Sequence, residues 1–239
     1  MPTVQGIAQT ALVQLNHTIG TFGSKLMGYL HGPATDDLVT FGPFCARVVL
    51  ENGCAALLAR LDAFRIMYLA EFQAQEEYKL EKRAKTAFSW LGDVMADGKA
   101  PASLWDIDHE VTKISRALFS GHMDHIFWRK AIEETVDFAL KRGSDPMLAE
   151  LTQMEPERFI STKRGVSAQL YSTLSKGVHW EFFNSLLVLD EATVKQTIRE
   201  ACVVVADLGL VSHFIPTAYA SMDKALAVET YIEFRRTLQ

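Results

Sequence analysis

Side chains that can do chemistry gather in the stretch YSTLSKGVHWEFF, which spans residues 171–183. Its imidazole, His179, belongs to the side-chain type with an ordinary pKa of about 6.5, which gives or takes a proton near neutral pH. Lys176 lies three residues earlier and shares a helix face with His179 if one helix continues through Gly177. A cation beside an imidazole suits general acid or base catalysis at a phosphate ester. His179 and Lys176 are therefore the candidate catalytic residues.

Five further residues are candidate binding residues around this imidazole. Tyr171 and Ser175 carry hydroxyls that can orient the ring, and Trp180 offers an aromatic face beside it. Lys163 and Arg164 are two more cations, which reach the imidazole only if the fold brings their segment back toward it. The same pattern also fits a hydrogen-bonded histidine that packs under aromatic neighbours and takes no part in chemistry.

A second group of chemically capable residues lies in GHMDHIFWRK, where His122 and His125 are three residues apart. Two imidazoles at this spacing can hold a transition metal if carboxylates join them from another helix. The candidate partners are Asp106, Asp108, His109 and Glu110. The Glu-x-x-His pairs of di-metal bundles are missing, so we predict no metal site and interpret the pair as the start of a helix after Gly121.

Signatures of the common cofactor sites are missing from the sequence. It has no GxxxxGK[ST], no GxGxxG after a strand, no HExxH, no GxSxG and no EF-hand loop, so we predict no cofactor. The cations Lys79, Lys82, Arg83 and Lys85 alternate with Glu81. Such a run is typical of a solvated helix face, and contact with phosphates is the alternative.

The elements that would position these residues are helices. Apolar side chains recur at helical spacing, and neither alternating strands nor a repeat period is found. The spacing predicts helices over Val4–Leu30, Phe44–Leu61, Phe64–Phe72, Leu104–Phe119, His122–Lys141, from Pro156 onward, Glu191–Val211 and Ile215–Phe234. The region from Ser167 to Phe183 is read as one helix or two, because it contains Gly177. The predicted fold is an all-α bundle of roughly eight to ten helices.

Two details of this bundle follow from single residues. Phe44–Leu61 is apolar around most of its circumference, which places it at the centre, where Arg47 and Glu51 are four residues apart and can pair. Asp190 is a plausible N-cap for the helix that follows it. We treat 1–239 as one helical domain, and the alternative is a division at the ADGKAP linker of residues 96–101 into 1–96 and 102–239.

Composition narrows the class of protein further. The chain has 239 residues, of which 49% are hydrophobic, with a formal charge of −5 that disfavours a surface built throughout for nucleic acid. Cys45, Cys54 and Cys202 show no CxxC pairing and read as small buried residues. No long apolar run or signal segment is found, so we expect no membrane contact and a cytoplasmic location. The apolar residues of 203–211 and 218–234 predict a homodimer or a larger protein complex.

The segment LSKGVHWEF, from Leu174 to Phe182, resembles the final-helix signature of the HEPN superfamily. The resemblance implies a small all-α domain in which the histidine acts as acid or base in RNA cleavage without a metal, while an arginine stabilises charge on the phosphate. It also implies pairing of two chains through the helices that carry the histidine. Members of the family are frequent in bacterial toxin–antitoxin and antiviral systems.

This chain departs from the family pattern at the arginine. The family places it four to six intervening residues before the histidine, where this sequence has Ser172, Thr173 and Leu174. Lys176 could supply the charge, but an ammonium does not grip phosphate in the bidentate way of a guanidinium. We therefore expect an interaction or regulatory module that binds a protein partner or RNA without cleaving it. The alternative is a metal-independent ribonuclease that uses His179.

Overall fold

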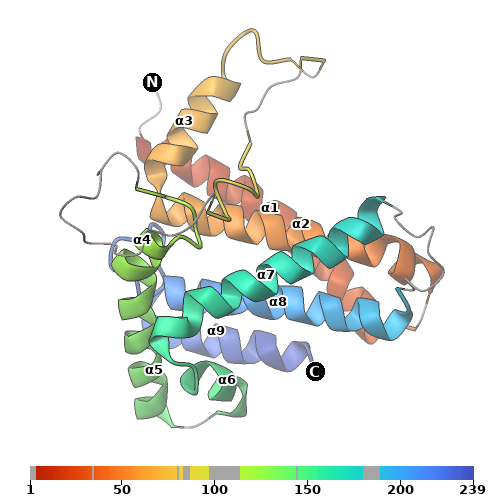
Figure 1. The fold of residues 1–239 in the computed structure, drawn as a ribbon, viewed down its shortest axis with the longest axis vertical. Helices are drawn as coiled ribbons and strands as arrows, with labels where there is room; N and C mark the ends of the chain where they lie inside the picture. Colours follow the sequence, from red (N-terminus) through yellow and green to blue (C-terminus); the bar gives the residue numbers. More distant parts are fainter. Residues whose placement is uncertain are drawn as a thin grey trace.

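Long helices lie side by side in the structure, a computed structural model, and shorter ones close the ends of the bundle (Figure 1). The structure describes residues 4–33, 35–79, 81–82, 87–96, 114–143, 145–179 and 189–239. Those residues form helices and turns without a β-strand, which confirms the predicted all-α bundle. None of their helices combines the length and the apolar character that crossing a bilayer requires.

The described residues contain nine α-helical segments, numbered in chain order. Their bounds are α1 Val4–His31, α2 Asp36–Leu61, α3 Ala63–Gln73, α4 Gly121–Met123, α5 Arg129–Arg142, α6 Ala149–Thr152, α7 Pro156–His179, α8 Glu191–Ser212 and α9 Lys224–Thr237. A π-helical turn, Asp124–Trp128, joins α4 to α5, and a 3₁₀ turn, Pro146–Leu148, precedes α6. The nine α-helical segments of the described residues fall within the predicted range.

Helix α2 lies at the centre, as its apolar circumference predicts. It packs against α1, α7 and α8, and Figure 1 shows α7 crossing the bundle while α3 rises away from the end of α2. Glycines permit the close crossings: a Cβ on Gly53 would lie 2.7 Å from Cγ1 of Val205 in α8, and one on Gly177 would lie 2.7 Å from Cβ of Pro43 in α2. Gly177 therefore brings α7 onto α2, and α7 runs through it as one helix to His179.

One buried apolar cluster draws residues from both sides of the undescribed segment 97–113. It extends from Leu26 in α1 to Leu238 beyond α9 and includes Trp128 and Phe159, whose rings are 6.4 Å apart. The predicted linker at 96–101 lies mostly outside the described residues. The two halves that it would separate contribute to this one core.

Several local predictions are confirmed. Nε of Arg47 donates to Glu51 at 3.0 Å, and the carboxylate of Asp190 accepts the N–H of Thr193 at 2.7 Å as the N-cap of α8. The three cysteines are buried and free, and burial raises the pKa of the Cys54 and Cys202 thiols to about 12. They serve as small core residues.

Three predicted helices are wrong in part. Ile215–Pro216–Thr217 does not open the last helix, because residues 213–223 form turns and Asp223 caps α9 by accepting the N–H groups of Ala225 and Leu226. The predicted helix Leu104–Phe119 does not reach Phe119, and its residues 104–113 lie outside the description. His122–Lys141 is interrupted by the π-helical turn.

The helix is lost near Phe119 because the backbone has other partners. The N–H groups of Leu118 and Phe119 donate to the carbonyls of Asp93 and Val94, at 2.9 and 3.1 Å. Phe119 therefore lies in a turn held against residues 93–94, which leaves its N–H unavailable for a helical bond.

The apolar residues from which self-association was predicted are largely used inside this chain. In α8, Val204, Leu208 and Val211 are buried against other helices, and in α9 Val228 and Tyr231 are buried as well. These five residues are part of the core of a single chain, whereas Met222 and Leu226 of the second stretch are 39% and 53% exposed.

Candidate functional site

The predicted site residues all lie on or just after one straight helix, α7. His179 is its last residue, with its side chain outside the description, and Trp180 also lies outside the described residues. Lys176 is exposed one helical turn before His179. Because α7 is continuous, Arg164 sits about 22 Å along the axis from His179 at 1.5 Å per residue, so the fold does not bring that segment back.

Lys163 is turned into the core. Its side chain is buried and its ammonium pairs with the carboxylate of Asp207 in α8. The other oxygen of Asp207 accepts the hydroxyl of Tyr231 at 2.7 Å, and Arg235 reaches it at 3.4 Å. Arg235 also bonds Glu150 at 3.1 Å. This network joins α6, α7, α8 and α9, so Lys163 has a structural partner and does not face a phosphate.

Tyr171 and Ser175 face the centre of the bundle. The Tyr171 hydroxyl accepts from Nη2 of Arg47 at 2.8 Å, and its ring stacks on Trp90 with centroids 4.4 Å apart and planes 7° apart. The Ser175 hydroxyl donates to the Tyr171 carbonyl at 2.6 Å. Arg47 thereby ties α7 to Glu51, which lines a hollow beside α1, α2 and α3.

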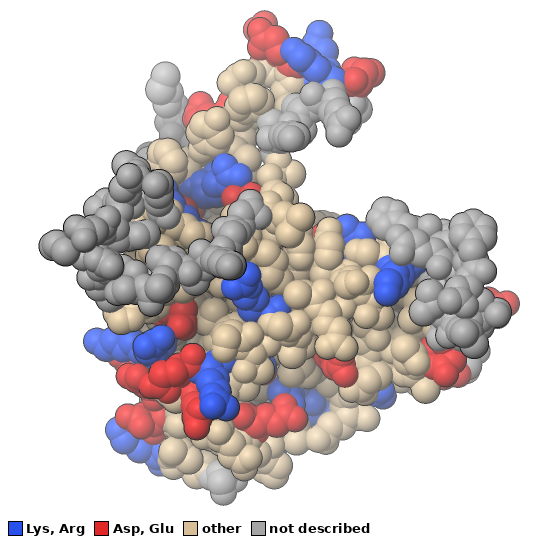
Figure 2. Space-filling model, in the orientation of Figure 1, with Lys and Arg blue, Asp and Glu red and all other residues tan. Residues whose placement is uncertain are grey.

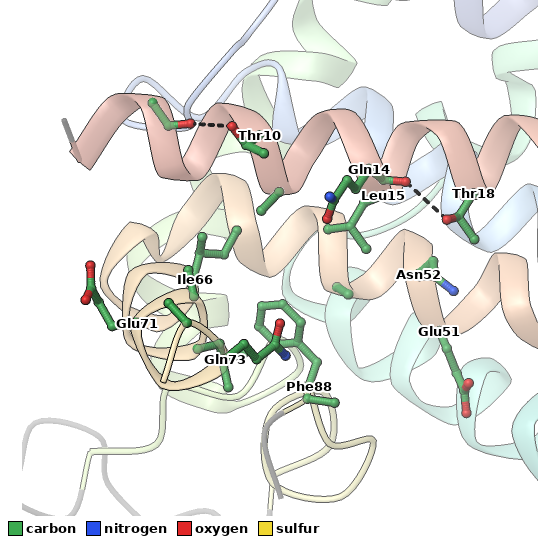
Figure 3. Close-up of a pocket in the computed structure, with 17 residues that line it drawn as sticks. Thr10, Gln14, Leu15, Thr18, Glu51, Asn52, Ile66, Glu71, Gln73 and Phe88 are labelled. Atoms are coloured by element: carbon green, nitrogen blue, oxygen red, sulfur yellow. Dashed lines mark hydrogen bonds between the residues drawn. The ribbon is translucent and has the colours of Figure 1, made fainter. Parts of the chain in front are cut away.

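That hollow, the α1–α3 groove, lies between the N-terminal half of α1, the middle of α2, α3 and residues 87–88. Its volume is about 720 Å³ and it is open to solvent. Figure 3 shows Ile66 and Phe88 between Glu71 and Glu51, which lie toward opposite sides of the view. Among the described residues that line it, the apolar ones are Ala11, Leu15, Ala55, Ile66, Leu69, Ala70, Ala74, Ala87 and Phe88.

The polar groups of the groove are hydroxyls, carboxylates and the side-chain amides of Gln14, Asn52 and Gln73, which carry both donors and acceptors. The hydroxyls of Thr10 and Thr18 donate to the carbonyls of Gly6 and Gln14 in their own helix, at 2.9 and 3.1 Å (Figure 3). Their oxygens can therefore only accept from a ligand. Two carboxylates lie at the ends, and no lysine or arginine is among the described lining residues. The groove is thus mainly apolar, with hydroxyl, amide and carboxylate groups around it.

Helix α3 is apolar on two sides. Ile66 and Leu69 are buried toward α1, whereas Phe64, Tyr68 and Phe72 are spaced four residues apart and are 63%, 51% and 38% exposed. Three aromatic side chains on one helix face form an exposed apolar surface beside the groove. The period of four was visible in the sequence, but which side of α3 faces water depends on how α1 covers it.

The histidine pair does not form a metal site in the described residues. His122 is buried in α4 while His125 is exposed on the π-helical turn, so the two side chains point in different directions. Ser120 caps α4 by accepting the N–H of Met123 at 3.2 Å, so a helix starts at Gly121, one residue before the predicted start at His122. The four carboxylate and histidine partners considered for a metal lie outside the description, and no cluster of three ligands is present within it.

Asp124 and Arg60 are charged residues in the interior that sequence reasoning did not single out. Burial raises the pKa of Asp124, one oxygen of which accepts from Nη2 of Arg129 at 3.2 Å. Burial lowers the pKa of Arg60 to about 10. The pairing of Asp124 with Arg129 could have been expected from the sequence, because Arg129 follows five residues later. The burial of Asp124 could not, because the helices that cover it are far away in sequence.

On the face drawn in Figure 2, the described Lys and Arg side chains are scattered among Asp and Glu and form no continuous basic surface. No protein-family model, no curated protein and no solved structure matches this chain. The HEPN resemblance stays a prediction.

Proposed function

We propose that this chain is a helical interaction module whose α1–α3 groove binds an amphipathic helix of a partner protein. The observation that carries the proposal is a groove of about 720 Å³ that is lined by three helices and remains open, with the exposed aromatic face of α3 beside it. An amphipathic helix buries its apolar stripe in such a groove and leaves its polar face in water.

The charges of the groove favour a partner with a basic residue. Glu51 and Glu71 lie at its ends, and Thr10 and Thr18 offer acceptors along one wall. Glu51 already accepts from Arg47 at 3.0 Å, so Glu71 carries most of the negative charge. A lysine or arginine at the edge of the apolar stripe would donate to Glu71 and to the threonine oxygens, whereas a phosphate backbone would meet the charge of Glu71. The geometry therefore supports a protein partner for this groove over RNA.

The test uses a fluorescein-labelled helical peptide built from Leu, Ala and Lys, with all leucines on one face. We expect it to bind the full chain by fluorescence anisotropy, and a peptide in which Glu replaces Lys to bind at least about tenfold more weakly, a difference of about 1.4 kcal/mol. A peptide with the same composition but scattered leucines should bind no more tightly than the Glu peptide.

Variants locate the binding site. Ala70→Leu fills the groove from α3, and because both residues are good helix formers it should keep the fold while weakening the Lys peptide about tenfold. Ala168→Leu is the matched control, since Ala168 is exposed on α7 away from the groove. Equal affinity for Ala70→Leu and the unmodified chain would place the peptide elsewhere and contradict the proposal.

A metal-independent ribonuclease is the second candidate. It is favoured by the continuity of α7 through Gly177, which keeps the exposed Lys176 one turn from His179, as the catalytic hypothesis requires. The test is cleavage of structured RNA in EDTA by the chain and by His179→Ala. Cleavage that survives the chelator and is lost in the variant supports the enzyme, and no cleavage by the unmodified chain rules it out.

The proposed setting is the reducing interior of a cell. Three buried thiols without a disulfide support this location, because oxidising compartments favour paired cysteines. Bacterial defence and RNA binding are implied by the HEPN resemblance alone, whereas the pairing of two chains was also predicted from the apolar residues of 203–211 and 218–234. Light scattering of the purified chain tests the pairing directly.

A further inference from the structure

A second hollow lies against the C-terminal half of α1, where α1, α8 and α9 meet. Its volume is about 400 Å³, which is within the usual range of small-molecule sites. The surface is almost entirely apolar and includes Ile19, Val49, Val205, Leu210 and Phe234. The hollow shares no lining residue with the α1–α3 groove.

Glycines border this hollow without making a close helix crossing. A Cβ built on Gly20, Gly23 or Gly209 would meet no atom within 4 Å. These three positions differ from Gly53, where a Cβ would collide with the neighbouring helix. Because glycine has no side chain, these positions leave space in the hollow. A ligand there would contact the backbone and small side chains of α1 and α8.

One end of the hollow is polar. Nδ1 of His213 accepts two hydrogen bonds, from Nη2 of Arg60 and from the N–H of Met222, each 3.1 Å long. Both partners are donors, so the ring proton of the neutral imidazole is on Nε2. Burial, with the charge of Arg60 as a second cause, lowers the pKa of His213 to about 4, which keeps the ring neutral at pH 7. His213, a lining residue of the hollow, therefore carries one N–H donor, on Nε2.

Arg60 stands behind this imidazole without an anion among the described residues. Its guanidinium donates to Tyr219 O at 2.9 Å, to the hydroxyls of Ser212 and Ser221, and to His213, all of which are uncharged acceptors. Arg60 is half-buried, and a cation with only neutral partners there is incompletely compensated. A negative group that accepts a hydrogen bond from the other nitrogen of the His213 ring would lie close enough to attract the Arg60 guanidinium. Its charge would partly offset the charge of Arg60.

We propose that this hollow binds a long-chain carboxylic acid. The hydrocarbon chain lies along Gly20, Gly23 and Gly209, and the carboxylate accepts the Nε2–H of His213 in the field of Arg60. The apolar lining accounts for the chain, and the uncompensated guanidinium accounts for the charge of the head group. This site is independent of the proposed α1–α3 groove, so either can fail without the other.

The experiment is a calorimetric titration of the purified chain with dodecanoate below its micelle concentration at pH 7.5. Gly23→Leu puts a side chain into the hollow, where the backbone has room for the Cβ, and should weaken dodecanoate at least about tenfold. Gly165→Leu is the matched control: it makes the same change on α7, where a Cβ also meets nothing, and lies outside the hollow. It should change affinity less than about twofold. Circular dichroism checks that both variants are folded.

Dodecanol tests the head group with the same chain. We expect it to bind about tenfold more weakly than dodecanoate, because it lacks the charge that Arg60 favours. No heat of binding with the unmodified chain, equal affinity for Gly23→Leu, or an equal loss in Gly165→Leu would each overturn the site. Equal affinity for dodecanol and dodecanoate would overturn the assignment of a carboxylate.

Discussion

Two sets of glycines in the long helices do opposite things. At Gly42, Gly53 and Gly177, an added Cβ would approach a side chain of another helix to 2.8 Å or less. At Gly20, Gly23 and Gly209, the same atom would meet nothing within 4 Å. The first set lets helices touch, and the second keeps them from filling the space between them. Glycine within a helix thus has two structural meanings that its sequence context does not separate.

The largest expected effect is at Gly53. Gly53→Ala places a Cβ 2.7 and 2.8 Å from the two γ carbons of Val205, a β-branched side chain that has little freedom to move away. Overpacking of this kind outweighs the gain in helix propensity, so we expect a loss of about 2 kcal/mol in the free energy of unfolding. Urea denaturation followed by circular dichroism measures it.

Val205→Ala provides the control for this clash. In the double variant the offending γ carbons are gone, so the cost of the alanine at position 53 should fall well below its cost in the unmodified chain. If Gly53→Ala costs the same in both backgrounds, contact with Val205 is not the reason that the position is glycine.

A smaller effect, of pH on stability, is expected from His213 at the polar end of the hollow between α1, α8 and α9. His213 has a folded pKa of about 4 against 6.5 for an unperturbed ring, so in acid the unfolded chain binds a proton that the folded chain does not. Its contribution is complete above pH 6.5 and is lost as the pH falls toward 4. The ring is half-exposed, so we discount the shift for screening and expect about 1 kcal/mol.

The measurement is urea denaturation at a series of pH values between 4 and 7.5, for the chain and for His213→Gln. The variant should lose stability less steeply between pH 6.5 and 4 than the unmodified chain. Parallel profiles for the two proteins would show that His213 is not the group that titrates.

The smallest expected effect has the opposite sign. Gly20→Ala adds a methyl group where nothing is near and removes backbone freedom from the unfolded chain, so it should stabilise by about 0.5 to 1 kcal/mol. Gly165→Ala, in α7, should stabilise by a similar amount. Thermal unfolding compares the two, and a destabilised Gly20→Ala would mean that the space beside α1 is closed.

The sequence was sufficient where local forces decide the outcome. The apolar circumference of α2, the Arg47–Glu51 pair and the Asp190 cap each depend on residues a few positions apart, and all three are present. The start of α9 was misplaced because Ile215 is apolar and precedes a proline, yet it is buried in a turn. The cap of Asp223 eight residues later decides where the helix begins.

The candidate site was harder to predict because it depends on tertiary partners. Lys163 looked like a free cation, and its partner Asp207 comes from α8, 44 residues later. Residues 87–95 are largely apolar in sequence, but Gly92 has a φ of 108° and the Asp93 carboxylate accepts the N–H of Ser89, which makes a turn. Neither hollow could be foreseen, because each requires three helices in their final positions.

The buried network around Asp207 determines how α7, α8 and α9 are positioned along one another. Apolar contacts between α7, α8 and α9 tolerate the exchange of one methyl group for another, but a carboxylate can meet Lys163, Tyr231 and Arg235 together in one arrangement only. If α8 shifted along its axis by one turn, about 5.4 Å, the carboxylate of Asp207 would be buried among apolar side chains without its partners. These four charged or hydroxylated side chains thus fix the register of α7, α8 and α9 along their axes.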